Sequence, residues 1–245
     1  MIANGPRLRG SGGYYSGPWL IGEIPDRVLL KIGEQIVHRL AIGHADITGD
    51  DFGTIFANAV DGIHRESPLG VADVIANGTA WSVKTIKHKT PGGQSSVRLI
   101  SGRNSPDFSL GISDPRKNPK DTGHAVLSIW NKRINESLGH HDELRIAILI
   151  RNMTDRTFCL FEQPATLFPA DDYHWQFNEN GNLEGHEKTT GVHCFTWQPH
   201  GSQFTIIRSV PGSARQFSIN RNVPLVGVDH VLRLVRFNKD WIKIG

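Results

Sequence analysis

The sequence predicts an α/β fold with a mixed central sheet flanked by helices and a β-rich C-terminal part. Helical periodicity covers residues 24–42 and 51–64, and short runs rich in β-branched residues begin after residue 70. Asn77-Gly78-Thr79 separates two of these runs, which is a strong signal for a β-hairpin. The chain of 245 residues can bury a sizeable core, and no linker or repeat divides it. We therefore expect a single domain, with residues 1–160 as its core and 161–245 as a β-rich lobe.

The two N-terminal helices are predicted from apolar residues at spacings of three and four. In the first helix they form one face that ends before Gly43, and in the second Asp50 or Asp51 is the expected N-cap. The apolar faces comprise Ile24, Val28, Leu29, Ile32, Ile36 and Leu40 in the first helix, and Phe52, Ile55, Phe56, Ala59, Val60 and Ile63 in the second.

The remaining elements follow from changes in period and from turn residues. Residues 71–76 and 80–86 are the expected hairpin strands, and residues 101–123, which contain three prolines, are expected to form a loop. A helix is expected over 125–138. Further strands are expected at 97–100, 143–151, 157–161, 173–177, 192–197, 203–208 and 216–219.

Charge is distributed unevenly along the chain. The net charge is +3, yet residues 84–133 hold ten Lys or Arg against three Asp or Glu, whereas residues 1–83 hold nine Asp or Glu. A basic stretch beside an acidic cluster suits phosphate binding next to a metal site. Cys159 and Cys194 match no metal-ligand spacing, and we expect buried free thiols in a reducing compartment. No apolar stretch approaches the length of a membrane span.

Asp73, Ser82 and Lys84 carry the chemistry that the sequence suggests. The carboxylate lies on one arm of the expected hairpin, and the lysine lies near its level on the other arm. Ser82 and Lys84 share a face of their strand, because residues two apart do so. A metal held by carboxylates polarises a phosphate and activates a bound water, and a neighbouring cation stabilises developing charge.

This segment resembles the active-site hairpin of the PD-(D/E)xK nuclease superfamily, which includes type II restriction endonucleases. Asp73 matches the first position of the motif and Lys84 the last. The resemblance covers roughly residues 24–90 and implies a restriction-endonuclease-like fold. It also implies Mg²⁺-dependent cleavage of double-stranded DNA, with Mg²⁺ held by Asp73, the main-chain carbonyl of Val83 and Glu34 on the upstream helix. Lys84 would position or activate the attacking water.

The chain departs from the family pattern at two positions. Ala72 stands where the family has proline, and Ser82 stands where it has Asp or Glu. The missing carboxylate is expected from Glu34, then from Glu136, then from Asp61 or Glu66. Ser82 is expected to support the site rather than to act as a nucleophile.

The basic tract after the hairpin is expected to contact DNA. Lys87 and Lys89 would hold phosphates, and Gln94 or Arg98 would read base edges. Arg103 is expected to join this surface. The histidines of the C-terminal part, His186, His193 and His200, match no zinc spacing, so we expect them to be surface or phosphate-contacting groups.

The sequence therefore predicts a type II restriction endonuclease that is cytoplasmic and, by its resemblance, prokaryotic. Both a two-fold homodimer and a monomer remain open. Two alternatives remain. One is a repair or recombination nuclease of the same superfamily, and the other is a non-catalytic DNA-binding protein whose site is inactive because Ser82 replaces the acidic residue. A β-rich binding protein unrelated to DNA is a third.

Overall fold

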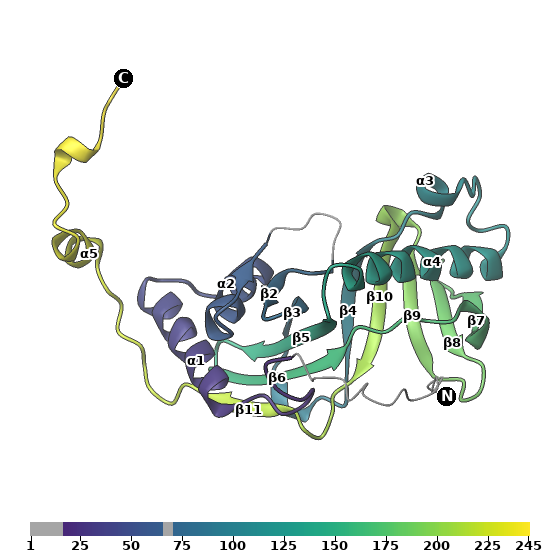
Figure 1. The fold of residues 1–245 in the computed structure, drawn as a ribbon, viewed down its shortest axis with the longest axis horizontal. Coiled ribbons are helices and arrows are strands. Elements are labelled where there is room, and N and C mark those ends of the chain that lie inside the picture. Colours follow the sequence, from purple (N-terminus) through teal and green to yellow (C-terminus); the bar gives the residue numbers. More distant parts are fainter. Residues whose placement is uncertain (1–16, 66–70) are drawn as a thin grey trace, which may run out of the picture.

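A mixed six-stranded sheet, sheet A, forms the centre of the part of the chain that the structure describes. The structure is a computed structural model and describes residues 17–65 and 71–245. The strand order is β1-β2-β3-β5-β6-β11, in which only β3 and β5 run parallel (Figure 1). The bounds are β1 Ile63–His64, β2 Val74–Ala76, β3 Thr79–Lys87, β5 Glu143–Asn152, β6 Thr157–Pro164 and β11 Arg215–Ser218. This confirms a mixed α/β architecture.

Two helices, α1 (Asp26–Ala41) and α2 (Gly49–Ala59), lie on one side of sheet A. Their apolar faces pack with Trp81 and Val83 of β3 in one buried core. The N-cap of α2 is Thr48 rather than Asp50 or Asp51; Asp51 completes a capping box by accepting from the Thr48 backbone N–H. The helix ends before the expected residue 64, because Asp61 adopts a positive φ of 54° and the chain then enters β1.

The hairpin of β2 and β3 forms where the sequence predicts it. Ala76 pairs with Thr79, so Asn77 and Gly78 are the two turn residues. Both have positive φ, 48° and 79°, which is the conformation that a tight hairpin turn requires and that Asn-Gly favours. The first strand is shorter than expected and begins at Val74 instead of Val71.

The connection from β3 to the parallel strand β5 contains β4 (Ser96–Arg103), α3 (Pro106–Leu110) and α4 (Pro119–Leu138). The stretch 101–123 is therefore not a simple loop. Pro119 occupies the first turn of α4 and the Asn118 side chain caps it, so the prolines in this stretch mark a helix start.

A second, antiparallel sheet, sheet B, has the strand order β4-β10-β9-β8-β7. Its other strands are β7 Tyr173–Phe177, β8 Leu183–Glu187, β9 His193–Gln198 and β10 Gln203–Ser209. Helix α4 crosses one face of this sheet (Figure 1), and Trp130 packs there against Phe168 and Phe204. The expected boundary near residue 160 does not separate the sheets, because β4 belongs to sheet B and β11 returns to sheet A.

A buried polar cluster ties the N-terminal segment to sheet A. The Arg145 guanidinium lies 2.7 Å from Glu162 and 2.6 Å from Glu143. Glu162 also accepts hydrogen bonds from the indole N–H groups of Trp19 and Trp81, at 2.6 and 3.1 Å. The side chains of Arg145 and Glu162 are fully buried, so β3, β5 and β6 share one buried ion pair inside the apolar core.

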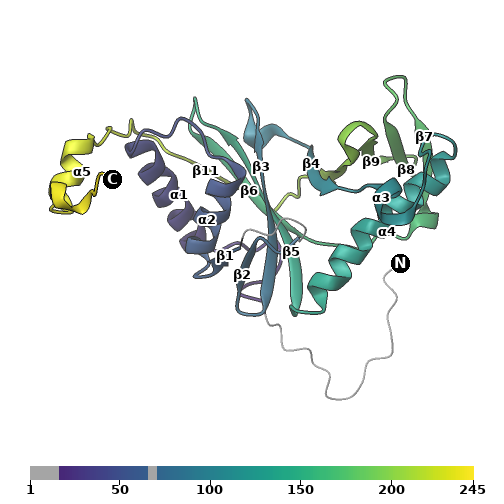
Figure 2. The same ribbon diagram turned by 90° about the horizontal axis from the view of Figure 1, so that it is seen from above.

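The C-terminal segment projects away from both sheets (Figures 1 and 2). It holds α5 (Val228–Leu234), which has no buried residue, and a short 3₁₀ turn at Lys239–Trp241. Among the described residues, no helix is both long and apolar enough to cross a membrane.

Candidate active site on the β2–β3 hairpin

Asp73 precedes β2 and faces β3 across the hairpin. Val74 pairs with Trp81, and the printed register of the hairpin ends at this pair. The Asp73 backbone N–H also donates to the Trp81 carbonyl, at 2.8 Å, which holds Asp73 at the end of β2 beside Ser82. Lys84 lies two residues beyond Ser82 and on the same face of the sheet. The sheet itself therefore brings together the three side chains of the predicted motif.

One carboxylate oxygen, Asp73 Oδ2, is the meeting point of these residues. It accepts from the Val83 backbone N–H at 2.9 Å and from Ser82 Oγ at 3.2 Å. Lys84 Nζ lies 3.7 Å away from this oxygen. The Lys84 side chain is 28% exposed and the Asp73 side chain is 20% exposed. The pair is therefore fixed in position yet open to solvent on one side.

The second carboxylate oxygen, Asp73 Oδ1, has no hydrogen-bond partner among the described residues, whereas Oδ2 accepts both bonds. Val83 provides another oxygen at the same edge. In a strand, the N–H and C=O of one residue point to the same side. Because the Val83 N–H points to Asp73, its carbonyl points to that edge too, where β2 pairs with β3 only as far as Trp81. The Val83 side chain is buried on the opposite face.

These two oxygens fit a hard divalent cation. Mg²⁺ in proteins is typically bound by one or two carboxylates and completes its shell with waters and substrate phosphates. Ser82 supplies no charge, because a serine hydroxyl is neutral, and this buried hydroxyl donates to Asp73. The hairpin therefore offers Mg²⁺ one carboxylate oxygen and one main-chain carbonyl, which is the lower limit of carboxylate ligands for this ion.

None of the expected replacement carboxylates reaches the hairpin in the described part of the chain. Glu34 is exposed on α1 and has no hydrogen bond or ion pair there. Glu136 lies 3.8 Å from Lys132, and Asp61 lies 2.7 Å from Lys31. Glu66 lies outside the described residues. Asp73 is thus the one carboxylate within ion-pair distance of Lys84 in residues 17–65 and 71–245.

Arg65 is a backbone neighbour of Asp73 that the sequence did not indicate. Its backbone N–H donates to the Asp73 carbonyl at 2.8 Å, and the β1–β2 register places it opposite Asp73 on the same face. Its side chain is exposed, and its charge contributes, after burial and His140, to lowering the pKa of His141. Apolar periodicity predicts a helix up to residue 64, so it gives no sign that residues 63–64 form a strand that brings Arg65 beside Asp73.

The expected DNA-contacting residues are not gathered around Lys84. Lys87 lies three residues further along β3, hence on the other face, where its charge helps to lower the pKa of Asp46 after the stronger effect of Arg151. Lys89 is exposed, and its carbonyl accepts from Asn152 at 2.7 Å.

The other three expected DNA-contacting residues, Gln94, Arg98 and Arg103, lie on β4 of sheet B or in the loop that precedes β4. Gln94 is held within its own loop, donating to the Thr90 carbonyl at 3.2 Å. Arg98 lies on β4 and donates to Thr196 of β9 at 2.7 Å. Arg103 ends β4 and is exposed. The basic tract thus spreads over two sheets rather than forming one patch beside the hairpin.

Comparison with known proteins gives no family assignment. No protein-family model, no curated protein and no solved structure matches the chain. The functional argument therefore rests on the geometry of the hairpin.

Proposed function

We propose that the protein is a Mg²⁺-dependent endonuclease that hydrolyses phosphodiester bonds in double-stranded DNA. The observation that carries this proposal is the arrangement around Asp73. Its carboxylate is fixed by the Val83 N–H and Ser82, faces Lys84, and retains one oxygen without a hydrogen-bond partner in the described structure. The acidic oxygen and the main-chain carbonyl can bind a metal, and the lysine ammonium beside them can stabilise negative charge during hydrolysis.

Each residue of the hairpin would have a distinct role in the reaction. Asp73 Oδ1 and the Val83 carbonyl would hold Mg²⁺, which when bound polarises the scissile phosphate and lowers the pKa of a coordinated water. Lys84 would orient the attacking water and stabilise the negative charge that develops on the phosphate. Ser82 would keep Asp73 in place. Arg65, exposed on the same face, would hold a neighbouring phosphate.

Because the hairpin has a single carboxylate, the free protein should bind Mg²⁺ weakly and the DNA phosphate should complete the shell. Replacing Ser82 by Asp would restore the acidic residue of the motif. We expect Ser82→Asp to lower the Mg²⁺ concentration needed for half-maximal cleavage. A Mg²⁺ requirement unchanged in a folded variant would contradict the assignment of Asp73 as a metal ligand.

The finer proposal is a type II restriction endonuclease, cytoplasmic in a prokaryote, that cuts at a fixed sequence. A two-fold homodimer would match a palindromic site, and light scattering would then give about twice the chain mass of 27.2 kDa. Incubation with plasmid and phage DNA in Mg²⁺ or EDTA, followed by sequencing of the ends, tests substrate and specificity. Ends at one sequence support restriction, and ends only at mismatches or junctions indicate a repair nuclease.

A second candidate is a non-catalytic DNA-binding protein. The single carboxylate at the hairpin favours it, because most such chemistry uses more than one acidic ligand. Its signature would be salt-dependent DNA binding in EDTA with no cleavage in Mg²⁺ or Mn²⁺. That result would overturn the nuclease proposal.

A further inference from the structure

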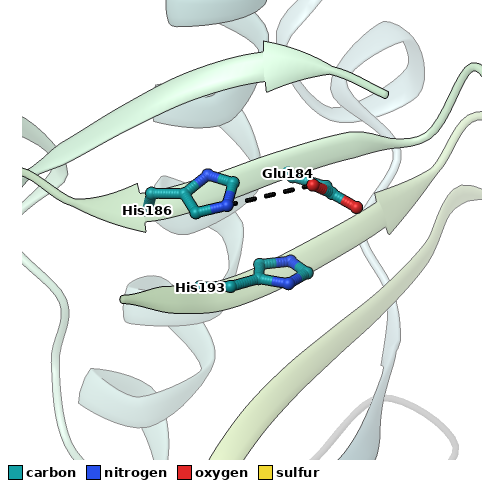
Figure 3. A group of neighbouring side chains, drawn as sticks. All are labelled: Glu184, His186 and His193. Atoms are coloured by element: carbon teal, nitrogen blue, oxygen red, sulfur yellow. Dashed lines mark ion pairs between the residues drawn. The ribbon is translucent and has the colours of Figure 1, made fainter. Parts of the chain in front are cut away.

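Glu184, His186 and His193 form a compact group (Figure 3). They lie on β8 and β9 of sheet B, whereas the hairpin belongs to sheet A. One potential ligand atom from each residue lies within 4.8 Å of the other two. His186 Nε2 is 3.9 Å from Glu184 Oε2, and the two imidazole rings stack with centroids 4.8 Å apart. In residues 17–65 and 71–245 it is the one group of three or more His, Cys, Asp or Glu this close together.

Strand geometry explains why these residues meet. Glu184 and His186 are two apart on β8 and therefore share a face, while Leu183 and Gly185 face the core. His186 pairs with His193 of β9 at a register shift after Gly185. The spacing in sequence matches no zinc motif, because the third residue comes from the neighbouring strand.

Two of the three residues also have hydrogen-bond partners outside the group. Asn178 Nδ2 donates to Glu184 Oε1 at 2.7 Å, which leaves Oε2 toward His186. His193 Nε2 lies 2.7 Å from the Phe195 carbonyl. A carbonyl only accepts, so Nε2 carries the proton and Nδ1 keeps its lone pair. A metal-binding histidine commonly donates its other N–H to a carbonyl in this way.

The residues make no direct hydrogen bond that would explain their approach. A separation of 3.9 Å between His186 Nε2 and Glu184 Oε2 is too long for one. Ligand bonds of about 2.0–2.2 Å in tetrahedral geometry separate two ligand atoms by about 3.3–3.6 Å. The group is therefore slightly wider than a loaded site, and small side-chain rotations would close it.

We propose that Glu184, His186 and His193 bind a divalent transition metal, with Zn²⁺ as the best match. Two imidazoles and a carboxylate suit Zn²⁺ and are poor ligands for Mg²⁺. Three protein ligands leave one position for water or an anion. Arg98 donates to Thr196 Oγ1, which lies 3.1 Å from His193 Nε2, the nitrogen that carries the proton. The site is independent of the proposed nuclease activity.

Zn²⁺ titration of the metal-free full chain, in competition with a chromophoric chelator, tests this proposal. We expect one Zn²⁺ per chain and a higher Tm, since a ligand that binds only the folded state stabilises it. His186→Ala and His193→Ala should each weaken binding by more than about 100-fold, beyond the cost of removing an outer partner. His38→Ala, an exposed histidine on α1, is the matched control and should bind as wild type.

Glu184→Gln is a variant that should remain folded, because its amide oxygen still accepts from Asn178 Nδ2 while the negative charge is lost. Its circular dichroism should match wild type, and its Zn²⁺ affinity should fall at least about tenfold. Substitution of Co²⁺ should give absorption bands typical of nitrogen and oxygen ligation, and these should disappear in His186→Ala. Absence of stoichiometric Zn²⁺ binding, or binding unchanged in the His186 and His193 variants, would overturn the proposal. Lys84→Ala should bind Zn²⁺ normally, which separates this outcome from failure of the nuclease proposal.

Discussion

The Asp73 carboxylate links the two arms of the hairpin as well as facing Lys84, so its removal should affect stability and activity to different degrees. Asp73→Ala deletes the acceptor of the Val83 N–H at 2.9 Å and of Ser82 Oγ at 3.2 Å. A hydrogen bond to a charged group contributes about 1.5–3 kcal/mol. The partly solvated contact with Lys84 adds at most about 1 kcal/mol. Both hydrogen bonds end on one partly exposed carboxylate oxygen, so their contributions are not additive, and we expect Asp73→Ala to lower the free energy of unfolding by about 2 kcal/mol.

Asp73→Asn is the matched variant, because its amide oxygen can still accept from the Val83 N–H. Its loss of unfolding free energy should stay below about 1 kcal/mol, while DNA cleavage should fall as far as in Asp73→Ala. Urea denaturation with an unchanged slope measures the first quantity, and plasmid cleavage measures the second. The reasoning is refuted if Asp73→Ala unfolds within about 0.5 kcal/mol of wild type, because the carboxylate then does not bridge the strands.

Three further predictions concern the framework around the site. Glu162→Gln should cost about 3 kcal/mol in urea denaturation, because it leaves the buried Arg145 with Glu143 as its remaining carboxylate partner; a loss under about 1 kcal/mol would contradict a buried ion pair. Gly78→Ala should cost about 1–2 kcal/mol, since φ is +79° and the new Cβ meets the Asp142 carboxylate; an unchanged Tm would count against this turn. Hydrogen bonding from Arg151 lowers the pKa of Asp46, so this carboxylate stabilises the fold above its unfolded pKa of about 3.9 and the contribution disappears as pH falls through the folded value. Asp46→Asn should therefore reduce Tm less at pH 3 than at pH 7, and an equal reduction at both would exclude this linkage.

Local sequence signals predicted the hairpin correctly, because its turn depends on two residues. Asn77 and Gly78 adopt the positive φ that their side chains tolerate best, and the register then follows from the strands beside them. Asp73, Ser82 and Lys84 meet for that reason alone.

Long-range strand pairing could not be read in the same way. Thr205 of β10 pairs with Ile100 of β4, about one hundred residues earlier, so β4 joins sheet B although it follows the hairpin in sequence. This pairing carries Arg98 away from Lys84. The Glu184, His186 and His193 group was missed for the same reason, since it depends on the shifted pairing of β8 with β9.

The end of the second helix was also predicted incorrectly from the sequence. The apolar period continues from Phe56 through Ile63, but the positive φ of Asp61 breaks the helix and starts β1. That change creates the third strand of the hairpin region and places Arg65 beside Asp73. Periodicity alone does not register such a break, because it reports which residues are apolar and not where the backbone turns.

Cleavage of supercoiled plasmid under single-turnover conditions, with wild type, Lys84→Ala and Lys132→Ala compared in Mg²⁺ and in EDTA, tests the central claim most directly. Lys132 is an exposed lysine of α4 paired with Glu136, so its variant controls for the loss of one positive charge. We predict Mg²⁺-dependent cleavage by wild type and Lys132→Ala, and a rate at least about 100-fold lower for folded Lys84→Ala, as for loss of one group that stabilises the transition state. Equal rates in Lys84→Ala and Lys132→Ala, or no cleavage by wild type in any divalent metal, would contradict an active site on the β2–β3 hairpin.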